Sequence, residues 1–256
     1  MARGGGSENR ARSPPVQLLA LKVAGVVAFF VLGDTERADG YWARALTLAE
    51  ELGASDDMAW ISDRVAGVAW DRGDTELAVA QYRRSLDHHR ASGNRLGEAD
   101  SLHLLGETLR DMGDFEGAET SLVQAGVIFE ELGMQLAFAN NVHSLGDLEL
   151  DRGDLTRAAD HYRACLAFFV GSGIQRSIAY CVAGMASVLS DRGSEEVAAS
   201  AWGAVCAAEE TSGFRMIASE RRRYEHRLSR LEETPAWRAG KERTLDQAVE
   251  LAFAGA

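Results

Sequence analysis

Glycine recurs at a fixed interval along most of the chain. Five glycines lie 40 residues apart, and a second series runs halfway between them in the same register. The first series is Gly33, Gly73, Gly113, Gly153 and Gly193, and the second is Gly53, Gly93, Gly133, Gly173 and Gly213. Asp follows the first four members of the first series, and Ser follows the fifth. Glycine ends helices in the left-handed conformation, and Asp or Ser caps the next helix, so the spacing predicts successive helical hairpins.

Apolar residues within each hairpin recur at helical spacing. In the third repeat Leu102, Leu105 and Leu109 line one face of the first helix. Ala118 and Leu122 of the second helix are expected to pack against them. A single hairpin of this kind cannot bury both of its faces, so the repeats must stack on one another. We therefore expect an all-α fold.

The register divides the chain into a tail, five repeats and a cap. Residues 1–15 are rich in Gly, Arg and Ser and are expected to be a disordered tail. The five repeats are 16–53, 54–93, 94–133, 134–173 and 174–213. After residue 213 the register fails, and 214–256 is expected to be a helical cap with one helix over 215–232. Thr244 and Gln247 have the spacing of a capping box that starts a final helix.

The first predicted helix is unusually apolar. Residues 16–32 contain one charge, Lys22, and follow two arginines, which is the outline of a signal peptide or a membrane span. A span needs about 20 apolar residues, and a central lysine costs about 2.5–3.5 kcal/mol there. Because this segment also ends at Gly33 in register, we interpret it as a repeat helix and expect no membrane association.

Charge and cysteine content narrow the classes of function. The 256 residues carry a net charge of −12, which disfavours direct nucleic-acid binding because neutralising phosphates needs a basic face. Cys165, Cys181 and Cys206 are odd in number and show no paired spacing, which favours a reducing cytoplasm over a disulfide framework. They fall at packing positions, so we expect inert core thiols.

The repeats resemble the tetratricopeptide (TPR) pattern. Leu105-Gly106 and Leu145-Gly146 stand at its Leu-Gly position, and Ala158, Tyr162 and Cys165 show its small–aromatic–small pattern in the second helix. The usual period is 34 residues, so each repeat here is six longer. The resemblance implies a right-handed α-solenoid of about five TPR-like hairpins with C-terminal capping helices.

A narrower resemblance covers residues 16–254. They look like the C-terminal, MalT-like TPR region of LuxR/AfsR-type bacterial transcriptional regulators. The similar segments are Ala201-Trp202-Gly203-Ala204, Arg223-Tyr224-Glu225, Trp237-Arg238-Ala239-Gly240 and Leu245 to Val249. Gly240-Lys241 lacks the spacing of a phosphate-binding loop. The resemblance implies the sensor or interaction half of such a regulator.

In TPR folds the first helix of each repeat lines the concave groove, which places candidate binding residues by register. They are Trp60, Asp63, Trp70, Asp100, His103, Glu107, Arg110, Asn140, His143, Asp147 and Tyr180. The mixture of aromatic, acidic and amide side chains suits a peptide or a protein helix, and the excess of carboxylates favours a basic partner segment. The alternative is that these residues are solvent-facing and bind nothing.

Two further patterns have competing interpretations. His103 with Glu107 and His143 with Asp147 repeat a His-x-x-x-acid spacing, which fits a metal or acid–base cluster but also ordinary pairing along a helix. The basic run of residues 221–223 has glutamates on both sides, which favours a solvated helix face over a phosphate-binding patch.

The sequence thus predicts a cytoplasmic, non-enzymatic scaffold that binds a protein or peptide in the concave groove. It predicts no cofactor and no metal. The alternatives are the sensor half of a LuxR/AfsR-type regulator, binding a small ligand or a separate ATPase or DNA-binding protein, and a metal-dependent enzyme built on the two histidines.

Overall fold

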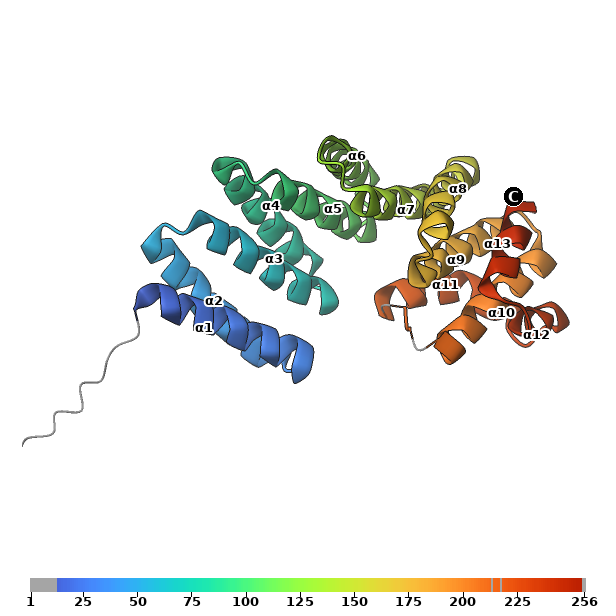
Figure 1. Ribbon diagram of the computed structural model, residues 1–256, viewed down its shortest axis with the longest axis horizontal. Helices are drawn as coiled ribbons and strands as arrows, with labels where there is room; N and C mark the ends of the chain where they lie inside the picture. Colours follow the sequence, from blue (N-terminus) through green and yellow to red (C-terminus); the bar gives the residue numbers. More distant parts are fainter. Residues whose placement is uncertain (1–12, 213, 217, 255–256) are drawn as a thin grey trace, which may run out of the picture. The chain divides into compact units, whose positions relative to one another are not determined.

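The protein is built from helices and short turns. Its computed structural model describes residues 13–212, 214–216 and 218–254, and no strand occurs within these ranges (Figure 1). The helices follow one another as hairpins, and the predicted all-α repeat fold is confirmed. The chain divides into two compact units, Met1–Ser101 and Leu102–Ala256.

The turns between helices have the predicted chemistry. Gly73 has a φ of +79°, and the side chain of the following Asp74 accepts a hydrogen bond from the backbone N–H of Leu77 at 3.1 Å. A left-handed glycine followed by a capping Asp also occurs at Gly33, Gly113 and Gly153. The last glycine of the second series, at position 213, lies outside the described residues.

The first unit is a pair of hairpins followed by the start of a further helix. Its elements are α1 (Pro14–Val26), a π-helical turn (Val27–Val31), α2 (Thr35–Leu52), α3 (Ser55–Asp71), α4 (Thr75–Ser92) and the first residues of α5 (Arg95–Asp111). The fully buried Trp42 of α2 lies against α1, where a Cβ atom on Gly25 would be 2.2 Å from its indole nitrogen. Glycine at position 25 therefore permits the two helices to pack.

The N-terminal helix differs from the expected boundaries. It begins at Pro14, a favourable first helical residue, so the last two residues of the predicted tail are helical. Residues 1–12 of that tail lie outside the described residues. Leu19 of α1 and Val31 of the π-helical turn are 60% and 72% exposed, so this segment presents an apolar outer face. In the part of the chain that the structure describes, no helix has the length and apolar character needed to cross a bilayer.

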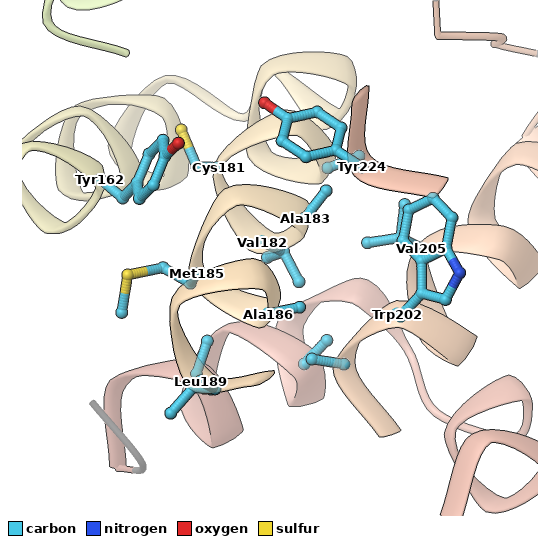
Figure 2. Packing of buried hydrophobic residues seen from close by; sticks show 14 of the residues in the cluster. Tyr162, Cys181, Val182, Ala183, Met185, Ala186, Leu189, Trp202, Val205 and Tyr224 are labelled. Atoms are coloured by element: carbon cyan, nitrogen blue, oxygen red, sulfur yellow. The ribbon is translucent and has the colours of Figure 1, made fainter. Parts of the chain in front are cut away.

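The second unit continues the hairpins with α6 (Phe115–Glu131), α7 (Gln135–Arg152), α8 (Leu155–Ser172), α9 (Gln175–Asp191) and α10 (Glu195–Ser212). The fully buried Tyr162 of α8 fits between α7 and α9. A Cβ atom on Gly146 or Gly184 would come within 2.8 Å or 2.5 Å of its ring. This explains the glycine of the Leu-Gly pattern, which makes room for the aromatic residue. Figure 2 shows the surrounding core, with Tyr162 beside Cys181 and Trp202 beside Val205.

The C-terminal region contains α11 (Ala218–Leu228), a 3₁₀ turn (Ser229–Leu231), α12 (Pro235–Lys241) and α13 (Leu245–Ala254). The capping box that starts α13 is confirmed, with Thr244 and Gln247 exchanging hydrogen bonds of 3.0 and 3.2 Å. Helix α12 was not predicted. It crosses α10 closely, because a Cβ atom on Gly240 would lie 2.1 Å from the carbonyl oxygen of Ser200.

Candidate functional site

In the second unit, α11 and the turn after it cover the face formed by the first helices of the repeats. Three arginines lie at positions i, i+4 and i+7 of this segment, so they share one side of it. We call them the arginine stripe: Arg223, Arg227 and Arg230. Opposite the stripe lie carboxylates near the C-terminal ends of α5, α7 and α9. We call them the acidic ladder: Asp111, Asp147, Asp151 and Asp191.

Arg223 joins two of the repeats. Its Nη2 lies 3.2 Å from Oδ1 of Asp111 on α5, and its Nη1 lies 2.9 Å from Oδ2 of Asp147 on α7. Nη1 also donates to Oε2 of Glu220, one helical turn earlier on α11, at 2.7 Å. The side chain of Arg223 is 13% exposed, so its charge is held mostly away from solvent and is balanced by three carboxylates.

Arg227 and Arg230 continue the contact toward α9. Arg227 lies 3.1 Å from Oδ1 of Asp151 and 2.7 Å from Oδ2 of Asp191. Arg230 donates to the hydroxyl of Ser190 at 2.9 Å. Each arginine therefore meets polar groups on one or two first helices, and the contacts follow the order of the repeats.

Asp147 is the most buried carboxylate of the site, at 1% exposure. Its Oδ1 accepts hydrogen bonds from the phenol groups of Tyr162 on α8, at 2.6 Å, and Tyr224 on α11, at 3.1 Å. Its Oδ2 accepts from Arg223, as above, and from Arg110 on α5 at 3.4 Å. A carboxylate with this many charge-assisted donors is held ionised and fixed in position.

The two acidic groups beside Arg223 have opposite pKa shifts. Burial alone would raise the pKa of Asp147, but the charges of His143, Arg223 and Arg110 lower it to about 2. Burial raises the pKa of Glu220 to about 7, and the neighbouring charge of Asp147 adds to this effect against the opposing pull of Arg223. Asp147 therefore anchors α11, whereas Glu220 is costly to keep ionised in the same place.

The sequence placed Arg110 and Asp147 among the groove residues. The structure has them buried, at 2% and 1% exposure, because α11 covers them. The expected solvated face for residues 221–223 is wrong for one of its members. Arg223 faces the acidic ladder, Arg221 pairs with Glu225 on its own helix at 2.7 Å, and only Arg222 is exposed.

The two histidine–acid pairs are engaged separately. His103 Nε2 lies 3.7 Å from Glu107, and the other ring nitrogen lies 3.1 Å from Oδ1 of Asn141. His143 Nδ1 lies 3.6 Å from Asp147, and its Nε2 lies 3.1 Å from the hydroxyl of Tyr224. Within the described ranges, no three His, Cys, Asp or Glu side chains are grouped so as to hold a metal ion.

The remaining candidates of the second unit are more accessible. Asn140 is exposed on α7, and Tyr180 of α9 is half-buried with its ring centroid 6.0 Å from that of His143. Glu107 accepts a hydrogen bond from the hydroxyl of Ser144 at 2.8 Å. His143 and Tyr180 thus lie beside the Asp147 cluster.

The candidates in the first unit have partners of their own. The half-buried ring of Trp60 has the ammonium of Lys22 4.6 Å and the guanidinium of Arg64 5.3 Å from its centroid. Asp63 accepts a hydrogen bond from Ser101 at 3.0 Å. Trp70 is half-buried and Asp100 is exposed.

The sequence interpretation missed three members of the ladder, although a signal for them was present. Asp111, Asp151 and Asp191 lie 40 residues apart, each two residues before a glycine of the first series. Asp71 stands at the same place in the second repeat. Extending the register to the C-terminal end of each first helix would have found them.

The cysteines also follow the register. The Sγ atoms of Cys165 and Cys181 lie 3.0 Å apart in the core, and the hydroxyls of Ser85 and Ser101, 80 residues earlier, lie 3.1 Å apart. Burial raises the pKa of Cys181 well above its usual value. The shared position indicates helix packing rather than thiol chemistry.

One pocket lies apart from the ladder, among α6, α7 and α8. It has a volume of about 370 Å³, and Phe129, Phe138 and Phe168 contribute to its lining together with Cys165. Its walls are mainly apolar, which suits a small apolar group rather than a charged one.

Comparisons with known proteins agree with this architecture. Residues 57–125 match the tetratricopeptide repeat family. BtubC (BKLC) from P. vanneervenii has a similar structure, with a TM-score of 0.59 and 16% identity over 80% of this chain and 94% of that one. A Rap protein complexed with competence and sporulation factor is also similar, with a TM-score of 0.65 and 15% identity over 94% of this chain and 77% of that one. No curated protein sequence matches the chain. The fold is that of a TPR-like helical repeat protein.

Proposed function

We propose that the protein is a non-enzymatic scaffold that binds a basic segment of another protein or a peptide through the acidic ladder. The observation that carries the proposal is the arginine stripe lying on the ladder. One basic helix already occupies this face, with Arg223 2.9 Å from Asp147 and Arg227 2.7 Å from Asp191. The first helices therefore form a surface that is complementary to arginines spaced along a helix.

The electrostatics support a basic partner. The chain carries a net charge of −12, and the ladder sets four carboxylates along one face. Such a surface attracts basic segments over a distance and fixes their register once they dock. Arginine suits it better than lysine, because its planar group bonds to two carboxylates at once.

The comparisons add support at the level of architecture. In the similar Rap structure the protein is complexed with competence and sporulation factor, so a helical-repeat fold of this kind holds a second molecule there. We extend binding of a protein or peptide to this chain, and we propose a regulatory role in the cytoplasm for it. We infer the chemistry of this chain's partner from the ladder, and not from the factor bound in the Rap structure.

The proposal predicts that partner binding depends on the ladder. A partner is captured from cells of the source organism, purified and titrated by calorimetry against the wild type and the Asp111→Asn/Asp151→Asn/Asp191→Asn variant. We expect at least tenfold weaker binding to the variant. Asp160→Asn is the matched control, because its side chain is 69% exposed and lies outside the ladder. Equal affinity of the partner for the wild type, the triple variant and the control would show that the ladder is not the binding surface.

A second candidate function rests on the phenylalanine pocket and on the resemblance to LuxR/AfsR-type regulators. As the sensor half of such a regulator, the protein would bind a small apolar ligand among α6, α7 and α8. Motif residues of that resemblance lie at the close contact of α10 with α12, where a Cβ atom on Gly203 would lie 2.2 Å from the carbonyl oxygen of Trp237. A thermal-shift screen against apolar metabolites tests it, and a hit must be lost in Phe138→Ser.

A further inference from the structure

The ladder is already occupied in this chain, which raises the question of how a partner would reach it. We infer that α11 is a built-in, displaceable occupant, and that the partner is a helix with the same arginine spacing that replaces it. The inference rests on the proposed function, and it adds both the pattern the partner must carry and an autoinhibitory role for α11.

Helix α11 is attached mainly by polar contacts. Among its described side chains, only Tyr224 and Leu228 are buried apolar or aromatic groups. Its other contacts include the ion pairs of the arginine stripe, the pairing of Arg221 with Glu209 near the end of α10, and the guanidinium of Arg221 5.4 Å from the ring centroid of Trp202. An equivalent set of arginines from another chain can replace those of α11, because the carboxylates belong to the repeats and stay in place.

Helix α11 is also an imperfect ligand for the surface it covers. Glu220 lies three residues before Arg223 and is 8% exposed, near the carboxylates of Asp147 and Glu107. Burying a carboxylate beside two others opposes docking, even with Arg223 2.7 Å away. A partner helix with an uncharged residue at this position would lack the Glu220 pair but would keep the contacts of the arginines with the ladder, and it would avoid this cost.

The partner chemistry follows from the contacts. It is a helix carrying Arg-Tyr, a second arginine four residues after the first, a third arginine three residues later, and no carboxylate three residues before the first. The tyrosine would replace Tyr224, whose hydroxyl lies 3.1 Å from both Asp147 and His143. The arginines would replace the stripe in the same order.

The test uses the chain's own segment in trans. The probe is a fluorescein-labelled synthetic peptide of residues 218–231, and its anisotropy is measured with the wild-type protein and with Arg223→Gln/Arg227→Gln, which weakens the internal occupant. A tethered segment has an effective concentration of about 1 mM, so a peptide with a Kd of about 0.1 mM should bind the wild type about tenfold more weakly than the variant. Arg222→Gln is the matched control, because Arg222 is exposed on the same helix, and it should behave as the wild type.

Two further peptides define the recognition. A peptide with Glu220→Gln should bind the released variant several-fold more tightly than the natural sequence. A peptide with Arg223→Gln and Arg227→Gln should not bind. Equal binding of all three peptides would show that the stripe does not recognise the ladder, and would overturn the inference.

A measurement on the wild type keeps the test decisive if the released variant does not fold. Saturating Glu220→Gln peptide should speed hydrogen exchange of α11 amides while leaving those of α12 and α13 unchanged. The inference is overturned if α11 exchange is unchanged, or if the wild type and a folded released variant bind the peptide equally. If α11 is not displaced but a purified partner still needs the ladder, this inference fails and the proposed function stands. If neither the peptide nor the purified partner binds through the ladder, both the inference and the proposed function fail.

Discussion

Two neighbouring parts of the C-terminal region are attached to the repeats by different kinds of interaction. Helix α11 lies on the acidic ladder through arginines, with distances such as 2.9 Å from Arg223 to Asp147. Helices α12 and α13 pack instead through close backbone contact and apolar side chains, including Trp237, Leu245 and the fully buried Ala248. The first kind of contact depends on charge, and the second depends on shape.

This difference indicates which part of the region can exchange. Apolar burial gives a stabilisation of about 25 cal/mol per Å² that salt does not screen, whereas ion pairs weaken as ionic strength rises. We therefore expect α12 and α13 to remain as a permanent end of the repeat stack. Helix α11 is the part whose attachment a variant, a pH change or a competing segment can alter on its own.

The largest expected effect comes from Asp147. Replacing it by Ala removes the common partner of Arg110, whose side chain is 0% exposed, and of Arg223. Breaking a buried ion pair by removing one partner costs about 3–5 kcal/mol. Chemical denaturation should show this loss. Hydrogen exchange should show α11 released while α12 and α13 stay protected.

Asp154 provides a contrast on the same unit, because it caps α8 at an exposed turn. Asp154→Ala should cost about 1 kcal/mol and should leave α11 protected. If Asp147→Ala leaves α11 as protected as in the wild type, the comparison between an ionic and an apolar attachment is wrong.

The next effect concerns the apolar attachment. Gly240→Ala places a Cβ atom 2.1 Å from the carbonyl oxygen of Ser200, a backbone atom that cannot move aside by rotation. Overpacking of this kind costs about 1–3 kcal/mol. Protection of α12 and α13 should fall. Gly171→Ala is the matched control, because nothing lies within 4 Å of its Cβ position, and a helical Ala there should stabilise slightly.

The same comparison shows what the sequence could predict. The 40-residue register predicted the left-handed glycines and the capping Asp residues, because both act within one turn of the chain. The seven-residue α12 was missed because it is too short to show helical periodicity, although Thr234 caps its first turn. The docking of Arg223 on Asp147 joins residues 76 apart, and no local pattern contains such a contact.

The third effect is a pH dependence that belongs to α11. Because the pKa of Glu220 is raised from 4.5 to about 7 in the folded protein, the folded state binds a proton that the unfolded state lacks between these values. Stability should therefore rise as the pH falls from 8 to 6, by about 1 kcal/mol. Glu220→Gln should remove this rise, and the difference between the two proteins isolates the contribution of Glu220. An identical pH profile for both would show that Glu220 is not buried against the ladder.

The smallest effect tests whether ionic contacts differ between α11 and α12. Arg227 is 23% exposed and pairs with Asp151 and Asp191. Arg227→Gln should lower stability by about 0.5–1 kcal/mol at low salt and by less at about 0.5 M salt, where screening shortens the reach of charges. Arg238 on α12 pairs with Glu233, but the two side chains are 66% and 71% exposed. Arg238→Gln should change nothing measurable at either salt concentration, because exposed pairs are solvated in both states. Equal losses for the two variants would mean that burial on the ladder adds nothing to an arginine–carboxylate pair, and that α11 is held by Tyr224 and Leu228 instead.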